Sequence, residues 1–428
     1  MAVQIISTQN DKLVFQVEIP LSGNIGVVED KIQKYCNELG NTATEHLLKN
    51  LDTDGSPIMV GNKSFSSKGT TRKMYHTPYG DVSIERHVYQ SSQGGKLYCP
   101  LDVNGRILNG ATPKYARMLS SKYANMSAPD VIQDLQGNHN RKERLAYLQK
   151  VADTVGNIAE EKNDLWSYNL PDFNESVHSI GISMDGAMLL MKDEGYRETM
   201  VGSISFYDPE GKRLHTIYKA APPEYGKMEF KSKFEKEIQK VKGRYPDAIY
   251  VGLADGAKDN WTFLSDYTKI QVIDFYHASE YISKAAEGIF NNKLSKDKRE
   301  EWIKETCHNL KNNNYAAKEV LTQLEELLCD GKKRSKSALD KINCAVTYFE
   351  NNLPRMNYSN NIEDKLPIGS GVIEAACKTI VKQRLCNSGM RWKEDGTRTV
   401  LNLRTLLKTD KRWEQFWNKF IMYGSNKI

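Results

Sequence analysis

The sequence predicts an α/β protein built around a mixed sheet flanked by helices. Three observations predict it. Residues 171–280 pass from strand patterns to alternating helix and strand, residues 281–366 keep helical spacing almost throughout, and residues 111–170 carry several short helical patterns. The chain has 428 residues, enough for two or three domains and a sizeable core. We therefore expect a sheet domain with an all-α insertion and a helical region in front of it.

The overall composition is that of an ordinary globular protein, with 39% hydrophobic and 27% charged residues. No apolar run approaches the ~20 residues needed to span a bilayer, and the first residues lack the basic and apolar parts of a signal peptide. The seven cysteines are an odd number without a CxxC pair, which favours a reducing compartment and argues against a disulfide scaffold or a standard zinc site. We expect a cytoplasmic protein without a membrane partner.

The positive charge is concentrated at the C-terminal end. The whole chain carries a formal charge of +6, whereas residues 374–428 alone hold 12 Lys and Arg against 5 acids, a balance of +7. Trp392, Trp413 and Trp417 lie among these basic residues, a composition typical of surfaces that contact phosphate and stack bases. For Trp413, Trp417 and Phe420 the favoured interpretation is structural, as apolar anchors of a tail helix.

Residues 1–110 are predicted to form an arm, one helix and small β-hairpins. Apolar residues at helical spacing predict the helix over 27–51. The stretch 52–72 is rich in turn-forming residues and is predicted to be a loop. Two strand patterns within 74–89, joined by a Pro-Tyr-Gly turn, predict a hairpin.

Residues 111–170 are predicted to form three short helices. Pro113 stands at the start of the first, Ser127 caps the second, and the third runs over 141–161. The third helix is predicted to carry basic residues near its start: Arg141, Lys142 and Arg144. Short helices with a tight turn and a basic third helix fit a helix-turn-helix that reads DNA. A plain helical bundle is the alternative.

The pattern over 171–280 predicts the first part of the sheet. Three strands are followed by a helix, a fourth strand, a second helix and a fifth strand, which is the element order of an RNase H-like core. In that topology the first and fourth strands are neighbours. Asp185, inside the first strand, and Asp255, at the end of the fourth, would then face each other.

A third acid follows much later in the chain. Glu374 lies in the first turn of a helix that begins after Gly369-Ser-Gly371, and a later helix can bring an acid to the same place. An all-helical insertion over 281–366 would explain its distance in sequence, and a separate bundle domain is the alternative. Residues 367–428 would complete the core with this helix and the basic tail. Taken alone, Glu374 also suits the positive end of a helix dipole.

Metal chemistry is the reason to connect these acids. Buried carboxylates without partners are costly, and two in contact repel each other. Divalent cations remove both costs, and oxygen ligands suit Mg²⁺ or Mn²⁺. Two such ions roughly 3.5–4 Å apart can activate a water or a 3′-hydroxyl and stabilise the leaving oxygen of a phosphodiester. We therefore predict that Asp185, Asp255 and Glu374 are catalytic metal ligands, although the Asp-Gly pair at 185–186 is also common in turns.

Asp274 and His277 close the fifth predicted strand and open a helix. The favoured interpretation is a helix cap with a histidine that already has a partner. The alternative is that they help to position DNA or a metal ion.

Five motifs stand out: Ser183-Met-Asp-Gly-Ala187, Leu253-Ala-Asp-Gly-Ala-Lys258, Asp274-Phe-Tyr-His277, Gly369-Ser-Gly-Val-Ile-Glu-Ala-Ala-Cys-Lys378 and Ser388-Gly-Met-Arg-Trp392. Together they resemble the DDE transposases of bacterial insertion sequences, in particular the ISKra-type group, which is related to the Mutator-like transposases. The resemblance covers residues 75–410. The last two motifs are the most specific, whereas the two Asp-Gly motifs are weak singly.

The resemblance implies DNA cleavage and strand transfer at the ends of an insertion sequence, with Mg²⁺ and a DDE triad in an RNase H-like domain that carries an all-α insertion. Matched motif by motif, Asp185 and Asp255 are the first two acids and Glu374 is the third. Asp274 and His277 match a further family motif whose role stays open. The expected partners are the terminal inverted repeats, target DNA and further copies of the chain, at the nucleoid in the cytoplasm.

Basic residues near the acids are expected to contact phosphate: Lys258, Lys378, Lys382, Arg384 and Arg391. Members of this group often carry a cysteine-rich hairpin upstream, but only Cys99 is present here, so no zinc is expected. Two other functions stay open. A DNA-binding repressor or domesticated relative would have lost transposition, against which the three acids count. A host nuclease with the same core would not need the N-terminal helices.

Overall fold

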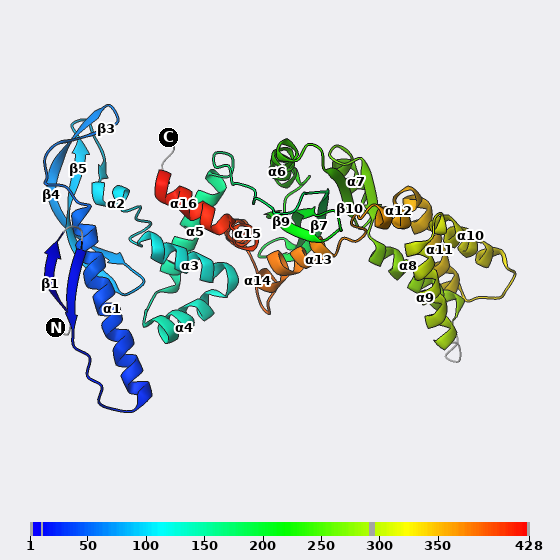
Figure 1. The fold of residues 1–428 in the computed structure, drawn as a ribbon, viewed down its shortest axis with the longest axis horizontal. Helices are drawn as coiled ribbons and strands as arrows, with labels where there is room; N and C mark the ends of the chain where they lie inside the picture. Colours follow the sequence, from blue (N-terminus) through cyan, green and yellow to red (C-terminus); the bar gives the residue numbers. More distant parts are fainter. Residues whose placement is uncertain (1–2, 10–11, 291–295, 426–428) are drawn as a thin grey trace. The chain divides into compact units, whose positions relative to one another are not determined.

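The structure is a computed structural model that describes residues 3–9, 12–290 and 296–425 (Figure 1). The chain divides into two compact units, which we call the N-terminal unit and the central unit. The N-terminal unit comprises Met1–Tyr168, Asn402–Leu407 and Arg412–Ile428, and the central unit comprises Asn169–Leu401 and Lys408–Lys411. No helix in the described ranges combines the length and the apolar character that crossing a membrane requires.

The N-terminal unit combines a two-stranded hairpin, a four-stranded antiparallel sheet and helices. Its elements are β1 (Val3–Gln9), β2 (Lys12–Val17), α1 (Ile25–Asn50), β3 (Ile58–Val60), β4 (Lys63–His76), β5 (Asp81–Ser91), β6 (Gly94–Tyr98), α2 (Pro100–Asn104), α3 (Pro113–Asn125), α4 (Ala128–His139), α5 (Leu145–Glu161) and α16 (Arg412–Tyr423). The strand order of the larger sheet is β3-β4-β5-β6. The helix predicted over 27–51 is confirmed as α1, which begins after Asn24, whose side chain accepts a hydrogen bond from the N–H of Val27.

The prediction that residues 52–72 form a loop is wrong. β3 and most of β4 lie in this stretch, and β4 pairs with β5 along most of its length. The many turn-forming residues are tolerated because the neighbouring strand supplies the backbone hydrogen bonds. Gly69, with a φ of 91°, takes up the irregularity between Ser67 and Thr70. The hairpin predicted over 74–89 is therefore only the end of a longer strand pair.

The three helices predicted for residues 111–170 are confirmed as α3, α4 and α5. Ser127 caps α4 as expected, because its side chain accepts a hydrogen bond from the first turn. The third helix begins at Leu145 and not at Arg141. Asn140, in the left-handed conformation with a φ of 52°, ends α4, and a short connection follows. The basic residues of this connection precede α5: Arg141, Lys142 and Arg144.

The C-terminal helix α16 belongs to the N-terminal unit, whereas the predicted division places all of 367–428 with the central sheet. Its apolar face explains the difference. Trp413, Trp417 and Phe420 are 6%, 1% and 1% exposed, which confirms their interpretation as core anchors. Arg106 of the same unit donates hydrogen bonds to two carbonyl groups in the last turn of α16. The aromatic residues of α16 therefore contribute to the core of the N-terminal unit, and Arg106 satisfies two carbonyl groups at the end of the helix.

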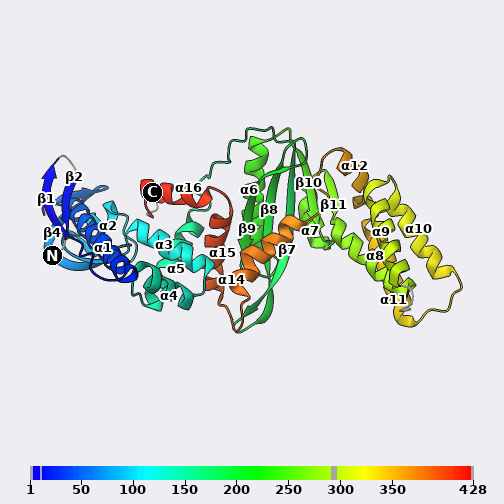
Figure 2. The ribbon, with the colours of Figure 1, turned by 60° about the horizontal axis from the view of Figure 1, so that its bottom comes forward.

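The central unit is built on a five-stranded mixed sheet flanked by helices (Figure 2). Its first elements are β7 (Ser179–Met191), β8 (Gly195–Tyr207), β9 (Arg213–Ala221), α6 (Met228–Arg244), β10 (Ile249–Ala254), α7 (Lys258–Ser265) and β11 (Ile270–Ile273). Its last are α13 (Gly371–Ala376), a π-helical segment (Cys377–Lys382), α14 (Gln383–Leu385) and the first part of α15 (Glu394–Lys408), whose residues Asn402–Leu407 belong to the N-terminal unit. The strand order is β11-β10-β7-β8-β9, with β7, β8 and β9 antiparallel and β7, β10 and β11 parallel. The prediction that the first and fourth strands are neighbours is confirmed, because β10 pairs with β7.

Helices cover both faces of this sheet. On one face, a Cβ added to Gly202 of β8 would lie 2.8 Å from the ring of Phe234, so α6 packs closely against the strand. On the other face, the thiol of Cys377 contacts Asp185 of β7. Gly202 pairs with Met184, the neighbour of Asp185 in β7. Because side chains alternate along a strand, the two contacts lie on opposite faces.

Helices fill the chain between β11 and α13. They are α8 (Phe275–Ile289), α9 (Lys296–Asn312), α10 (Ala316–Cys329), α11 (Lys336–Asn352), a short 3₁₀-helix (Leu353–Arg355) and α12 (Tyr358–Glu363). Residues 281–366 are therefore almost wholly helical where they are described, as predicted. Buried apolar residues of α8, α10 and α11 form one continuous cluster with those of the sheet. The helices and the sheet fold around one core.

Gly288 in α8 gives a test of this packing. A Cβ at Gly288 would lie 2.5 Å from the backbone oxygen of Ala338 in α11. We expect Gly288→Ala to lower the free energy of unfolding by about 1–3 kcal/mol, because the two helices must move apart. Gly243→Ala in α6 is the matched control, since open space surrounds that position, and it should be neutral or stabilising by up to about 1 kcal/mol. Urea denaturation measures both variants, and equal stability would contradict the close contact.

Candidate active site

Two of the three predicted acids belong to neighbouring strands, with Asp185 inside β7 and Asp255 directly after β10. Ser183 of β7 pairs with Leu253 of β10 in parallel register, and Asp185 and Asp255 each follow two residues later. Equal spacing from a registered pair brings both acids to the same level of the sheet, at the carboxyl end of β10 and the middle of β7. Burial raises the pKa of Asp185, and the charge of Asp255 raises it further. The two carboxylates are therefore close enough to interact.

The helix after the Gly-rich turn brings the third acid toward this place. Glu374 lies in the first turn of α13, and the hydroxyl of Ser370 donates a hydrogen bond of 3.4 Å to its Oε1. Three residues later, the thiol of Cys377 donates to Oδ2 of Asp185 at 3.6 Å. Burial raises the pKa of this thiol, and the charges of Asp185 and Glu374 raise it further. All three predicted acids thus lie around the contact between β7 and the start of this helix.

Asp274 and His277, at the start of α8, lie next to the helix that carries Glu374. Asp274 is fully buried, and it accepts hydrogen bonds from the N–H groups of His277 and Ser370. Its interpretation as a helix cap is confirmed, and the same side chain ties the turn before α13 to the start of α8. His277 places Nε2 3.9 Å from Oε1 of Glu374 and Nδ1 3.2 Å from Oε2 of Glu280. Asp274 therefore braces the site, while His277 faces the third acid.

The donor set fits a divalent cation such as Mg²⁺ or Mn²⁺. In the described parts of the chain, no basic side chain forms an ion pair with Asp185 or Asp255. A partly buried carboxylate beside a second one is costly unless a cation neutralises it, and hard oxygen ligands suit these ions. The oxygens of Asp185, Asp255 and Glu374 do not all lie within 4.8 Å of one another among the described residues. Two ions roughly 3.5–4 Å apart need such a wider set of ligands.

A second acidic cluster, in the N-terminal unit, is an ion-pair network. His76, Asp81 and Glu143 form the one group of three in the described ranges whose ligand atoms all lie within 4.8 Å. Arg141 already occupies these oxygens, since its Nη2 lies 2.5 Å from Oδ1 of Asp81 and 2.7 Å from Oε1 of Glu143. The hydroxyl of Tyr115 donates to the same oxygen of Glu143 at 2.6 Å. The guanidinium supplies the positive charge that a metal ion would otherwise bring.

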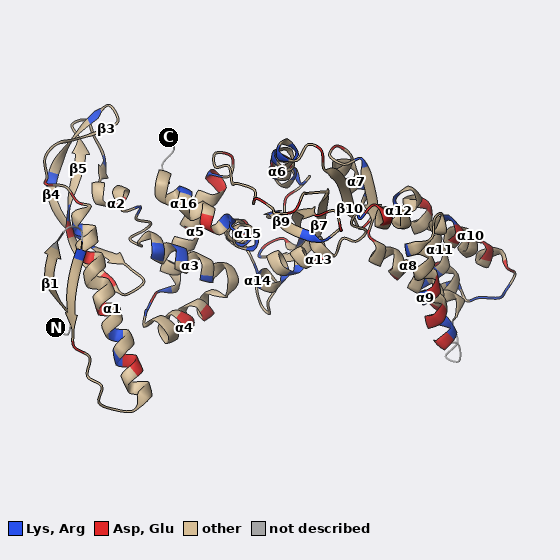
Figure 3. Ribbon diagram, in the orientation of Figure 1, with Lys and Arg blue, Asp and Glu red and all other residues tan. Residues whose placement is uncertain are grey.

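Lys and Arg are found along the ribbons of both units (Figure 3), and the predicted phosphate contacts among them divide into exposed and buried side chains. The exposed ones are Lys142, Arg144, Lys258, Lys378, Lys382 and Arg391. Arg384 is only 2% exposed, and its guanidinium lies 5.1 Å from the centre of the Trp392 ring. Arg141 is 5% exposed and lies in the network described above. The prediction that these two arginines contact DNA is therefore corrected: both guanidinium groups are turned into the protein.

Asp185 predicts a pH-dependent stability. Its pKa is raised above the usual 3.8 in the folded chain, so the folded state binds its proton more tightly than the unfolded state. This contribution to stability is complete below pH 3.8 and is lost as the pH rises through the raised pKa. In EDTA at pH 7 we expect Asp185→Asn to melt at a higher temperature than the parent, with the difference vanishing at the acid end.

Addition of Mg²⁺ should raise the melting temperature of the parent and close this difference, because an ion that binds only the folded state stabilises it. Thermal denaturation at several pH values measures both effects. A variant that melts below the parent at pH 7 in EDTA would contradict the unfavourable burial of Asp185.

Sequence reasoning missed several residues beside the acids. Cys377 contacts Asp185 and opens the π-helical segment, a rare local widening that is frequent at functional sites. Its place in the Ala-Ala-Cys-Lys run is the signal that could have found it. A cavity of about 1090 Å³ also adjoins Asp255, and of its lining only Asp255 and Lys258 were predicted. The other lining residues are scattered along the chain, so no spacing rule could have found them.

A scan of the chain against protein-family models finds no match, and a search of curated proteins finds none either.

Proposed function

We propose that this protein is a DDE-type transposase of a bacterial insertion sequence, with an RNase H-like core and an all-α insertion. It would bind the ends of the element, cut the DNA there and join the freed ends to target DNA. The single observation that carries the proposal is the convergence of three acids beside the carboxyl end of β10 and the middle of β7. Asp185, Asp255 and Glu374 come from distant parts of the chain, and no described basic side chain neutralises the two aspartates.

In this function the three carboxylates hold the catalytic ions, for which Mg²⁺ or Mn²⁺ fits best. When bound, two such ions supply activation of the attacking oxygen and stabilisation of the leaving oxygen. The protein itself binds and orients the strand. Exposed Lys378 and Lys382 follow Glu374 on the same helical stretch and offer charge for phosphate. His277 places its imidazole beside that carboxylate, with Nε2 3.9 Å from Oε1 of Glu374.

The proposal also covers the binding partners of the protein and its location in the cell. The helices α3–α5, with the exposed Lys142 and Arg144 in front of α5, would read the terminal inverted repeats. Target DNA is the second nucleic-acid partner. Because joining two ends requires at least two active sites, copies of the chain would assemble on DNA. Such a protein would act at the nucleoid in the cytoplasm.

The test uses the purified full chain and a linear DNA that carries the sequences flanking its gene, with their terminal repeats. We expect nicks at the repeat boundary in Mg²⁺ or Mn²⁺, joined products when a plasmid is added, and no reaction in EDTA. DNA of the same length with scrambled ends is the control. Tight binding of the ends without nicking would overturn the proposal and favour a repressor. Equal nicking of scrambled DNA would instead favour a nuclease.

A further inference from the structure

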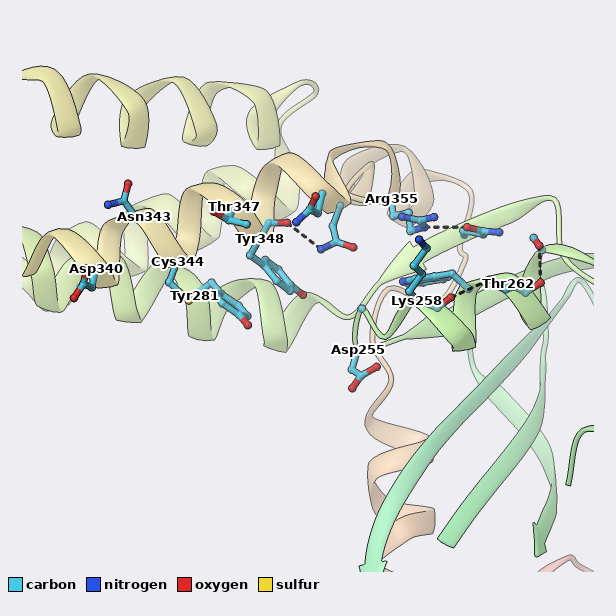
Figure 4. Close-up of a pocket in the computed structure, with 16 residues that line it drawn as sticks. Asp255, Lys258, Thr262, Tyr281, Asp340, Asn343, Cys344, Thr347, Tyr348 and Arg355 are labelled. Carbon is cyan, nitrogen blue, oxygen red and sulfur yellow. Dashed lines mark hydrogen bonds between the residues drawn. The ribbon is translucent and has the colours of Figure 1, made fainter. Parts of the chain in front are cut away.

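The cavity beside Asp255 lies within the central unit, between α7 and α11 (Figure 4). One wall carries Lys258 and Arg355, and the opposite wall carries the rings of Tyr281 and Tyr348. Figure 4 shows Asp255 at the end of β10, between these two walls. A ligand that fills the cavity would therefore reach one of the proposed catalytic acids. Its volume, about 1090 Å³, is just above the range of ordinary ligand sites, which is roughly 300–1,000 Å³.

The first wall favours an anion. The guanidinium of Arg355 lies 4.6 Å from the centre of the Trp261 ring, and its Nε donates a 2.9 Å hydrogen bond to Gln271. Burial lowers the pKa of Arg355, and no carboxylate in the described ranges pairs with it. Lys258 is exposed on the same wall and has no described acidic partner either. Two cations that no acid pairs with favour a ligand that brings negative charge at this wall, and the carboxylates of the lining, Asp255 and Asp340, lie apart from it, at the end of β10 and on α11.

Two polar groups in the lining lack a hydrogen-bond partner among the described residues. One is Nε1–H of Trp261, a side chain that is only 6% exposed, and the other is the hydroxyl of Tyr348. Buried donors without partners are rare and costly. Both atoms have almost no accessible surface, so they lie behind the lining and a ligand in the cavity does not reach them.

The second wall is planar and polar. Tyr281 and Tyr348 stack on each other, with ring centres 3.8 Å apart and planes 10° apart, and their hydroxyl ends are directed toward the side where Asp255 lies (Figure 4). Asn343 and Asn351 of α11 add side-chain amides to the lining. Aromatic rings and amides next to cations match a ligand that combines planar bases with phosphates.

We propose that this cavity holds a short unpaired stretch of the DNA strand that is cut at the neighbouring acids. Its phosphates meet Lys258 and Arg355, and its bases meet the tyrosine and asparagine wall. The inference rests on the proposed function, because it takes the occupant to be DNA that reaches Asp255. A free nucleotide has the same chemistry and is the other source that the experiment separates.

The test uses two variants and one control in the full chain. Lys258→Gln removes the exposed charge of the first wall, so the melting temperature should stay the same, whereas affinity for single-stranded DNA should fall about 2–10-fold. Arg355→Gln removes the charge and should weaken binding about 3–10-fold. Lys318→Gln is the matched control, because Lys318 is exposed on α10 and lies outside the cavity lining, and it should bind as the parent does.

The probe is a fluorescein-labelled oligothymidylate, with its anisotropy measured in EDTA so that binding does not depend on cleavage. Unlabelled thymidine monophosphate is the competitor that represents the free nucleotide. Weaker binding by Lys258→Gln and Arg355→Gln alone, with little competition from the monophosphate, supports the proposal. Parent-like binding by both variants overturns it. Competition by the monophosphate at the concentration at which the oligomer itself competes also overturns it, in favour of a free nucleotide.

The outcome is separable from that of the proposed function. A chain that binds the oligomer through this cavity but never nicks element ends would contradict the transposase and leave a nucleotide site. A chain that nicks the ends, and whose two variants bind the oligomer as the parent does, would contradict only the cavity.

Discussion

Glu374→Gln is expected to nick element-end DNA at least about 10²–10³-fold more slowly than the parent, the loss that follows removal of one preorganised electrostatic contact at a reaction centre. The amide keeps the size of the side chain and its contact with Ser370, so the fold should be unchanged. Asp185→Asn and Asp255→Asn should lose a similar factor. Since the three carboxylates act as one unit, the Asp185→Asn/Glu374→Gln double variant should be little slower than either single variant. Single-turnover nicking in Mg²⁺ measures these rates.

The matched control is Glu326→Gln, which removes an exposed carboxylate from α10 in the same unit. It should nick at the rate of the parent, which shows that loss of one negative charge elsewhere has no effect. If Glu374→Gln nicks as fast as the parent, Glu374 is not the third catalytic acid. Binding of the uncut DNA should persist in all the acid variants, because removing negative charge does not weaken contact with phosphate.

Arg141→Met is expected to lower the free energy of unfolding by about 3–5 kcal/mol, the cost of leaving a buried charge without its partner. Its guanidinium pairs with Asp81 and with Glu143, whose side chain is only 5% exposed. In the Arg141→Met/Glu143→Gln double variant most of this loss should be recovered, because the neutral amide still accepts the hydrogen bond from Tyr115. Urea denaturation, followed by a probe in the N-terminal unit, measures the change.

Arg144→Met is the control for this prediction. Arg144 is exposed, so its loss should change stability by no more than about 0.5 kcal/mol, while reducing the salt dependence of DNA binding by the equivalent of about one phosphate contact. The opposite pattern would contradict the structure: Arg141→Met with parent stability and weaker DNA binding would make Arg141 a DNA contact and not a buried brace.

Periodicity was a good guide to the central unit. The strands that became β7 and β10 are apolar runs, and the helices of the stretch 281–366 have apolar residues at helical spacing, because burial of one face is encoded locally. The neighbouring positions of the first and fourth strands were also predicted, and with them the meeting of Asp185 and Asp255. The stretch 52–72 was predicted wrongly, because its strand depends on a partner and not on its own residues.

The acids, the helical stretch and the tryptophan anchors of α16 could be predicted from the chain alone, because residue type and spacing carry that information. Which charged side chains are buried could not be predicted from the chain alone. Arg141 and Arg384 both looked like phosphate contacts, but Asp81 and Trp392 hold them inside, and such partners are set by how distant segments pack. The cavity beside Asp255 is of the same kind. Only the tertiary structure places Trp261 and Tyr348 around one space, since no local pattern relates side chains from different helices.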